Sequence, residues 1–165
     1  MCLTLEASDL MNPIWWADAA FAVHGDMKSH SGGIMTLGKG AIQSISRKQK
    51  LNTKSSTEAE VVGADDVLSE LLWTKNFMTE QGYAPEDTTL YQDNTSAMLL
   101  ETNGQRSAGK RSRHIDVRYF FIKDCIERGQ MKLEYCPTDD MVADFMTKPL
   151  QGRKFYKFRK MIMNL

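Results

Sequence analysis

Asp93 follows a short apolar stretch, residues 90–92, that has the pattern of a buried strand. A helix is expected to begin directly behind it, with Asn94, Thr95 or Ser96 available as its N-cap. A carboxylate at the point where a strand gives way to a helix lies at the mouth of an α/β sheet, where such folds bind their ligands. Taken alone, Asp93 is more simply explained as a helix cap. What favours a ligand site is the placement of three other acids.

Those three acids stand where neither capping nor solvent exposure explains them. Asp18 interrupts a strongly apolar stretch, residues 14–21, in which an unpaired carboxylate is costly. Glu60 lies one turn into an expected long helix, on the same side as the apolar stripe that must face the sheet. Asp144 lies between two apolar residues, too far into the expected last helix to cap it.

The long helix also separates Glu60 from its neighbour Glu58. Ser55 and Glu58 have the spacing of a capping box, so Glu58 is explained by its position at the start of the helix. On the helical wheel Glu58 falls roughly opposite Glu60, beside Asp65 and Ser69, and it is expected to face solvent. Glu60 is therefore the candidate for a site, and Glu58 is not.

The elements expected around these acids follow the order βββαβαβα. Strands are expected at residues 14–21, 32–37, 41–46, 90–92 and 131–136, with a tight turn at 38–40. Helices are expected at residues 57–81, 95–102 and 113–128 and from residue 138 onward. This order predicts an α/β fold with a mixed five-stranded sheet, a three-strand antiparallel meander plus two parallel strands, flanked by helices. The strands that carry Asp18 and Asp93 would be parallel neighbours, which brings the four acids to one end of the sheet.

Composition places the chain among ordinary globular domains. Its 165 residues suffice for one domain, and no run of about 18 apolar residues indicates a membrane span. The first residues lack the pattern of a signal peptide, and three widely spaced cysteines suit a reducing compartment. The formal net charge is zero, but two segments are locally basic. Five basic residues and one acid lie between residues 105 and 118, and six basic residues with no acid follow Asp144.

Four converging carboxylates with no basic partner nearby in the sequence would repel one another strongly. Such a cluster is stable with cations between its members or with some groups protonated. Carboxylate oxygens are ligands that Mg²⁺ and Mn²⁺ prefer. Two such ions about 3.5–4 Å apart form the clamp used for in-line hydrolysis of phosphodiesters. The set of acids, in this order and on this strand pattern, therefore indicates metal-dependent phosphodiester chemistry.

Each of the four acids lies in a longer motif: Trp16-Ala-Asp18-Ala, Lys54-Ser-Ser-Thr-Glu-Ala-Glu60, Tyr91-Gln-Asp93-Asn-Thr-Ser-Ala97 and Ala143-Asp144-Phe-Met-Thr-Lys-Pro-Leu150. These motifs closely resemble the ribonuclease H domain of copia-type (Pseudoviridae) LTR retrotransposon polyproteins. The resemblance covers residues 13–150, nearly the whole chain. Residues 1–12 would then be a lead-in from the upstream polyprotein, and residues 151–165 a basic C-terminal helix or tail.

The resemblance implies an enzyme that hydrolyses the RNA strand of RNA–DNA hybrids during reverse transcription. The family's D-E-D-D ligands fall on Asp18, Glu60, Asp93 and Asp144, which would hold two Mg²⁺ ions, with Mn²⁺ able to substitute. The expected partners are the hybrid and a reverse transcriptase domain upstream in the same polyprotein, with no membrane. The isolated domain is expected to be a monomer, and its location cytoplasmic, inside the virus-like particles of the retrotransposon.

The hybrid is expected to be read through its shape and backbone. The candidate contacts are Ser56, Thr57, Asn94, Lys110, Arg111, Arg113 and His114, of which the basic ones would hold the DNA strand. Cellular and retroviral relatives carry a mobile histidine before the last helix, and the expected short loop at residues 136–139 has none. His114 could take its place, but on its helix it shares a side with Phe121 and Cys125, which favours a structural role. For His24 and His30 we expect solvent or turn roles.

Three other interpretations compete with the nuclease. The first is a catalytically weak binding module on the same fold, which an activity assay with Mg²⁺ would distinguish. The second is another nuclease of the broad fold, such as an integrase core, but such enzymes take their glutamate from a late helix, and Glu60 lies on the first. The third is a purely structural role for every acid, which the positions of Glu60 and Asp144 argue against.

Overall fold

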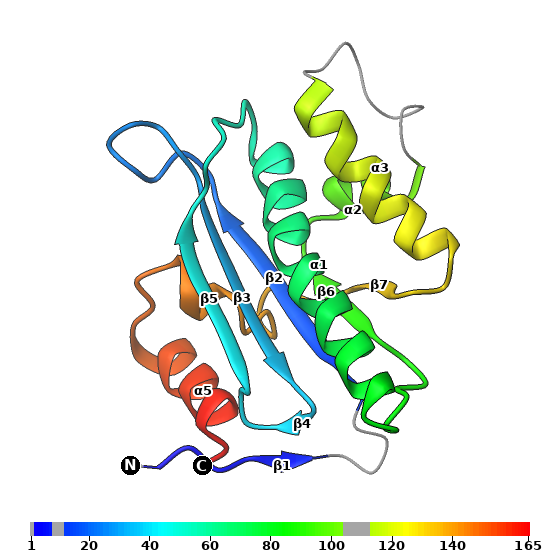
Figure 1. Ribbon diagram of the computed structural model, residues 1–165. Coiled ribbons are helices and arrows are strands. Elements are labelled where there is room, and N and C mark those ends of the chain that lie inside the picture. The colour runs from blue at the N-terminus through cyan, green and yellow to red at the C-terminus, as the bar shows by residue number, and fades with distance from the viewer. Residues whose placement is uncertain (1, 8–11, 104–112) are drawn as a thin grey trace.

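The computed structural model describes residues 2–7, 12–103 and 113–165. Its centre is a five-stranded sheet with the strand order β5-β3-β2-β6-β7 (Figure 1). These strands are β2 (Ile14–Ala20), β3 (His30–Thr36), β5 (Gln43–Lys48), β6 (Thr89–Gln92) and β7 (Lys132–Tyr135).

The predicted mixed topology of the sheet is confirmed. β2 pairs antiparallel with β3, and β3 pairs antiparallel with β5, which gives the meander. β2 pairs parallel with β6, with Trp16 opposite Tyr91, and β6 pairs parallel with β7. Because β2 and β6 run in the same direction side by side, their carboxyl ends meet at one edge of the sheet.

Helices cover both faces of the sheet (Figure 1). One face carries α1 and α3, with α2 packed beside them, and the other carries α4 and α5. Their bounds are α1 (Ser56–Glu80), α2 (Thr95–Asn103), α3 (Arg113–Glu127), α4 (Asp144–Thr147) and α5 (Gly152–Met163). α1 begins at the N-cap Ser55, whose hydroxyl accepts from the backbone N–H of Glu58 at 3.2 Å.

The alternation of side chains along the central strand divides the core in two. Trp15 and Ala17 are fully buried in the larger cluster, together with Leu71 of α1. Trp16, on the opposite face of the same strand, packs against a smaller cluster that includes Phe158 of α5. A strand with apolar residues on both faces is expected at the centre of a sheet that is covered by helices on both sides.

The turn between the second and third strands of the meander differs from the prediction. Residues 38–40 were expected as a tight hairpin turn, but β4 (Gly38–Lys39) forms a short antiparallel ladder with β1 (Glu6–Ala7). Gly40 has a φ of +78°, and a Cβ there would lie 2.4 Å from the carbonyl oxygen of Thr4. The lead-in segment therefore packs where the sequence suggested only a turn, and the third strand of the meander begins later, at residue 43.

The predicted last helix is also placed differently. Residues 138–143 form turns, and α4 begins only at Asp144, which makes the connection after β7 longer than the expected loop of residues 136–139. Met141, Val142 and Ala143 are buried in this connection. The burial of three consecutive apolar residues is incompatible with a surface helix beginning at Thr138, which explains why the capping pattern there was misleading.

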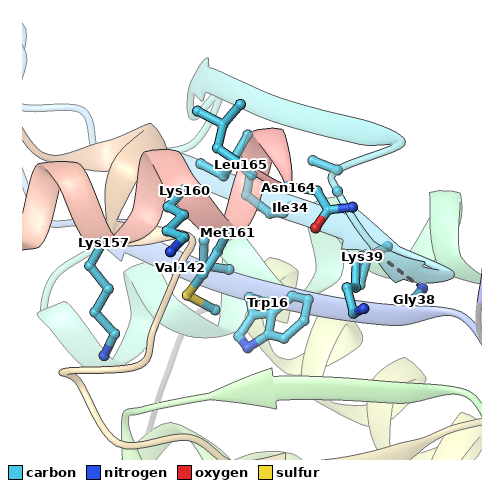
Figure 2. A pocket seen from close by; sticks show the side chains of 14 residues that line it. Trp16, Ile34, Gly38, Lys39, Val142, Lys157, Lys160, Met161, Asn164 and Leu165 are labelled. Carbon is cyan, nitrogen blue, oxygen red and sulfur yellow. Dashed lines mark hydrogen bonds between the residues drawn. The ribbon is translucent and has the colours of Figure 1, made fainter. Parts of the chain in front are cut away.

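The face that carries α5 is hollowed beside the helix. A cavity of about 430 Å³ lies between α5, β4 and the sheet, and Figure 2 shows Trp16, Ile34 and Val142 around it. Lys157 and Lys160 extend from α5 toward the same space (Figure 2). The C-terminal helix is thus a packed part of the fold, anchored by Phe158.

Candidate metal centre

Three of the four predicted acids meet at the end of the sheet. Asp18, Glu60 and Asp93 each offer one carboxylate oxygen, and these three oxygens lie within 4.8 Å of one another. Asp18 and Glu60 are buried, whereas Asp93 is only partly buried. An ion at this end of the sheet can therefore be reached from solvent beside Asp93 and still be held by buried ligands.

The parallel pair of strands positions two of these acids. Asp18 lies near the carboxyl end of β2, and Asp93 follows the last residue of β6. Asp93 is held by Thr138, whose hydroxyl donates to its Oδ2 at 2.9 Å. Asn94, next in the chain, caps α2 by accepting from the backbone N–H of Ala97 at 3.0 Å. Since Asn94 supplies the cap, Asp93 does not have to.

A close approach of α1 to the sheet brings Glu60 to the same place. A Cβ at Gly63 would lie 3.3 Å from the Cβ of Ala19 and 3.4 Å from the backbone oxygen of Asp18. Without a side chain at this position, the first turns of α1 lie directly on the end of β2. Glu60, three residues earlier on the helix, is therefore held against Asp18.

A second glycine allows α4 to lie against the opposite face. Gly32 stands opposite Asp18 in the sheet, and a Cβ there would lie 2.5 Å from Cγ2 of Thr147 and 2.9 Å from the Cβ of Met146. The hydroxyl of Thr147 and the ammonium group of Lys148 both donate to the carboxylate of Asp18. The short helix α4 thus supplies hydrogen-bond donors to an acid that lies about 130 residues earlier in the chain.

Asp144 lies next to this group but is held by two lysines. Its Oδ1 accepts from Lys148, and its Oδ2 accepts from Lys154 of α5 at 2.6 Å. Lys148 also contacts Asp18, with 3.2 Å between its Nζ and Oδ1 of the acid. The assumption that no basic residue partners the acids is therefore wrong, because Lys148 follows Asp144 by one helical turn. The group within 4.8 Å comprises three acids of the four, and the role of Asp144 as a fourth metal ligand stays a prediction.

Burial and mutual repulsion raise the pKa values of the two buried acids. Burial raises the pKa of Glu60 well above its usual range, and the negative charges of Asp18 and Asp93 raise it further. Burial also raises the pKa of Asp18, against the opposing effects of Lys148 and of the Thr147 hydrogen bond. A positive ion placed between these carboxylates would relieve both effects at once.

The helix-wheel argument about the two glutamates of α1 succeeds in part. Glu60 lies in the acid group, and Glu58 does not. Glu58 takes part in the cap, because its Oε2 accepts from the backbone N–H of Lys54 at 2.8 Å. Its expected exposure to solvent is wrong, since only 5% of its surface is accessible. Residues 58–64 of α1 are all buried, so the wheel has no solvent face over these two turns.

Most predicted contacts to nucleic acid remain predictions. Ser56 is exposed and Thr57 partly exposed at the start of α1, and the side chain of Asn94 is occupied by capping. Lys110 and Arg111 lie outside the described residues, as do the side chains of Arg113 and His114.

The other two histidines hold a hairpin together. Nε2 of His24 lies 3.0 Å from Nδ1 of His30, and Nε2 of His30 lies 2.9 Å from the hydroxyl of Ser46 on β5. His30 is the first residue of β3, so it belongs to the sheet as well as to the connection before it.

Four residues at the site were missed by sequence reasoning. They are Thr138, Thr147, Lys148 and Lys154. A signal was available for two of them, because the threonine and the lysine of Asp144-Phe-Met-Thr-Lys148 follow the acid at helical spacing. For Thr138 and Lys154 the sequence offered no such signal, since both act across separate elements.

No helix within residues 2–7, 12–103 and 113–165 has both the length and the apolar content to cross a membrane.

The homologues of this chain are polyproteins much longer than it. It is 34% identical over 166 residues to the retrovirus-related Pol polyprotein from transposon TNT 1-94 of Nicotiana tabacum, which matches 98% of the chain and 12% of the polyprotein. It is 35% identical over 138 residues to the retrovirus-related Pol polyprotein from transposon RE2 of Arabidopsis thaliana, with 83% of the chain and 9% of the polyprotein covered. The chain thus spans about a tenth of the length of these relatives. No family model matches the chain.

Solved structures with the same fold include ribonucleases H. LC11-RNase H1, isolated from compost, superposes with a TM-score of 0.56 at 13% identity, covering 82% of this chain and 91% of that one. The foamy viral protease-reverse transcriptase in complex with an RNA/DNA hybrid has a TM-score of 0.55 at 11% identity, covering 87% of this chain and 21% of that one. The homologues of this chain are therefore retrovirus-related Pol polyproteins of plant copia-type transposons, and its fold is the ribonuclease H fold, as the motifs predicted.

Proposed function

We propose that this chain is a metal-dependent endonuclease that hydrolyses the RNA strand of RNA–DNA hybrids during the reverse transcription of a retrotransposon. The observation that carries the proposal is the convergence of Asp18, Glu60 and Asp93 at the end of a ribonuclease H sheet. The homology to Pol polyproteins and the hybrid in the foamy viral neighbour support the choice of substrate.

The chemistry of the acid group fits a hard divalent cation. Oε2 of Glu60 is buried and has no hydrogen-bond partner among the described residues. A buried carboxylate oxygen without a partner is costly, and a metal ion would satisfy it. Asp18, Glu60 and Asp93 would hold Mg²⁺ through oxygen atoms alone, and Asp144 is the candidate for a fourth ligand. The same set of donors suits Mn²⁺.

The residues around the acids would prepare the site for hydrolysis. Bound Mg²⁺ supplies activation of the attacking water and stabilisation of the leaving oxygen. Thr138 orients Asp93 by hydrogen bonding to one oxygen, which leaves the other available as a ligand. Thr147 donates to Oδ2 of Asp18, and the ammonium group of Lys148 lies 3.2 Å from its Oδ1. Lys148 contacts both Asp18 and Asp144 and balances their charge. RNA cleavage by this arrangement would leave 5′-phosphate and 3′-hydroxyl ends.

A cleavage assay tests the proposal directly. A hybrid labelled on its RNA strand is incubated with the chain in Mg²⁺, in Mn²⁺ and in EDTA, beside an all-DNA duplex and an all-RNA duplex of the same sequence. We expect cleavage of the hybrid in either metal, none in EDTA, and none of the two control duplexes. Glu60→Gln is the matched variant, because it keeps the size of the side chain and removes its charge. Undiminished cleavage by this variant would contradict the assigned site.

One observation favours a second candidate, a catalytically weak module that binds the hybrid. Both carboxylate oxygens of Asp144 are occupied by lysines, so this acid has to change partners before it can bind a metal. Such a module would bind the hybrid in Mg²⁺ with the same affinity as in Ca²⁺ but would turn it over very slowly. Binding without measurable cleavage would decide for this candidate.

The wider context is also a proposal. The homologous polyproteins extend far beyond this segment, and we propose that a reverse transcriptase domain lies upstream of it in the same polyprotein. The domain would act in the cytoplasm, inside virus-like particles, and as a monomer when isolated. Fractionation of cells that express the whole polyprotein, with the domain followed by an antibody, would test the location.

A further inference from the structure

A basic pocket lies beside the acid group, between the connection that follows β7 and the first turns of α5. It has a volume of about 340 Å³ and is lined by Asp139, Arg153, Lys154 and Lys157. Three cations around one acid give it a net positive charge. The pocket is separate from the larger cavity described above, although Lys157 borders both.

The charges on α5 are arranged against the preference of a helix. The helix contains five basic residues and no acid, and two of the basic residues, Arg153 and Lys154, lie in its first turn. The first turn is the positive end of the helix dipole, where acids stabilise and cations destabilise. The N-cap residue, Gln151, makes no capping hydrogen bond with its side chain. An anion in the pocket would offset this concentration of positive charge at the start of the helix.

The pocket is directly connected to the acid group. Lys154 donates to Oδ2 of Asp144 at 2.6 Å and to the backbone oxygen of Thr138 at 2.9 Å. Thr138 in turn donates through its hydroxyl to Asp93. A group bound in the pocket is thus separated from the proposed metal ligands by one lysine and one threonine.

The two outer cations of the pocket differ in their present partners. Lys157 donates to the side chain of Asp140 and to the backbone oxygen of Asp139, each at 2.6 Å. Arg153 is exposed, and within the described part of the chain it takes part in no ion pair. Its guanidinium group is therefore available, and its planar set of donors matches the geometry of a phosphate.

We infer that the Arg153–Lys157 pocket binds a phosphodiester group of the nucleic acid, next to the acid group that would cut it. The inference rests on the proposed function and adds a contact from α5, a helix that carries none of the nucleic-acid contacts predicted from the sequence. Arg153 supplies the main contact, and Lys157 adds a second charge.

The experiment compares two pairs of substitutions that remove the same charge. Arg153→Gln with Lys157→Gln changes the pocket, and Lys39→Gln with Lys132→Gln is the control. Lys39 and Lys132 are exposed, each in a surface ion pair, and they lie at the opposite end of the sheet. Lys154 is left unchanged because it contacts Asp144. The dissociation constant (Kd) of a labelled RNA–DNA hybrid is measured in Ca²⁺ over a series of salt concentrations.

We expect the pocket variant to bind the hybrid about tenfold more weakly at about 0.1 M salt, and its log–log salt slope to fall by nearly two, at about 0.9 per lost contact. The control variant should stay within about twofold of the wild type. Equal affinity and slope for the two variants would overturn the inference. Arg153→Gln alone should show about half of the change in slope. This single variant replaces the double variant in the measurement if melting curves show that the double variant is unstable.

Neutral linkages identify the strand and the phosphate. A single methylphosphonate is placed at successive positions of the RNA strand and then of the DNA strand. At the contacted position, neutralisation should weaken binding by the wild type and leave the pocket variant unaffected; the absence of any such position on either strand would refute the contact. Cleavage by the wild type in Mg²⁺ is measured in parallel. If the wild type cleaves the hybrid and the pocket variant binds it as tightly as the wild type does, this inference is refuted and the proposed nuclease is not. If binding depends on the pocket but the wild type does not cleave, the proposed nuclease is refuted and this inference is not.

Discussion

Two buried glutamates on neighbouring helices have opposite surroundings. Glu60 of α1 lies within 4.8 Å of two other carboxylates at the end of the sheet. Glu101 of α2 is completely buried, and neither of its carboxyl oxygens has a hydrogen-bond partner among the described residues. Burial raises the pKa of both, that of Glu101 to about 8.

The difference shows what distinguishes a site from a buried charge. For Glu101 the least costly way to avoid an isolated negative charge is to keep its proton at neutral pH. For Glu60, two acidic neighbours and an opening beside Asp93 make a divalent cation the better solution. Burial alone therefore predicts a shifted pKa, and convergence of acids at an accessible edge predicts a metal.

The largest effect expected from this comparison is that of Asp93→Asn on cleavage. Loss of one ligand should slow hydrolysis of the hybrid by about a thousandfold or more, about 4 kcal/mol of barrier. In EDTA the free energy of unfolding should stay the same or rise, because one of three mutually repelling charges is gone. The cleavage rate measures the first effect, and urea melts in EDTA measure the change in the free energy of unfolding. A clear loss of stability in EDTA would show that Asp93 has a structural role.

The next effect is the pH dependence that Glu101 gives to stability. The pKa is about 8 in the folded state and 4.5 ordinarily. Between these values the folded state holds one more proton than the unfolded state, so the free energy of unfolding falls as pH rises, by up to about 1.4 kcal/mol per unit. The contribution is complete below pH 4.5 and lost above about pH 8. Glu101→Gln should remove this slope and stabilise the protein at pH 8 by about 4 kcal/mol.

Urea melts from pH 5 to pH 8.5, with and without Mg²⁺, provide the control for this prediction. In EDTA, Glu60 should also make the free energy of unfolding fall as pH rises, and Mg²⁺ should suppress this contribution because it replaces the proton. The contribution of Glu101 to the pH dependence should persist in Mg²⁺. If Mg²⁺ abolished the dependence of the unfolding free energy on pH entirely, Glu101 would not be the buried group that stays protonated.

A smaller effect is expected for Lys148→Met. Lys148 neutralises part of the charge of Asp18 and Asp144, and without it these acids would repel each other. The lysine side chain is 40% exposed, so solvent screens the interaction, and the loss in EDTA should be about 1–2 kcal/mol. With Mg²⁺ bound the loss should shrink. An equal loss of unfolding free energy in EDTA and in Mg²⁺ would show that Lys148 does not act through the metal centre.

The smallest effect is expected for Glu58→Ala, on the same helix as Glu60. It removes the bond to the N–H of Lys54 and should cost about 1 kcal/mol in melts with or without metal. The cleavage rate of the folded protein should be unchanged, which makes Glu58 a matched contrast to Glu60. A tenfold or larger drop in rate would place Glu58 in the site after all.

The sheet was predictable because its pattern is local. Alternating and apolar runs marked all five of its strands, and the order of elements was sufficient for the pairing of β2 with β6. The ladder between β1 and β4 was not predictable, because two-residue strands carry no periodic signal. The start of α4 was misjudged for a related reason. Thr138 and the two acids after it resemble a helix cap, but the buried residues 141–143 decide the conformation.

For the site, the acids could be chosen from sequence and their partners could not. Helical periodicity distinguished Glu60 from Glu58, since it depends only on spacing along one helix. The contacts of Thr138 with Asp93 and of Lys154 with Asp144 join separate elements, and no single-helix or single-strand pattern encodes them. Glu101 was missed because a glutamate in an amphipathic context is ordinarily exposed.

The separation of the site residues along the chain has a consequence for biosynthesis. Lys148 reaches Asp18 across 130 positions, and Glu60 and Asp93 come from between them. A polypeptide emerging from the ribosome can form the meander early, but contacts of such long range form late, because closing a long loop costs entropy before it yields any interaction. The acids would therefore be assembled only after nearly the whole domain has been synthesised. A nascent or truncated chain would carry the separate carboxylates without the assembled acid group.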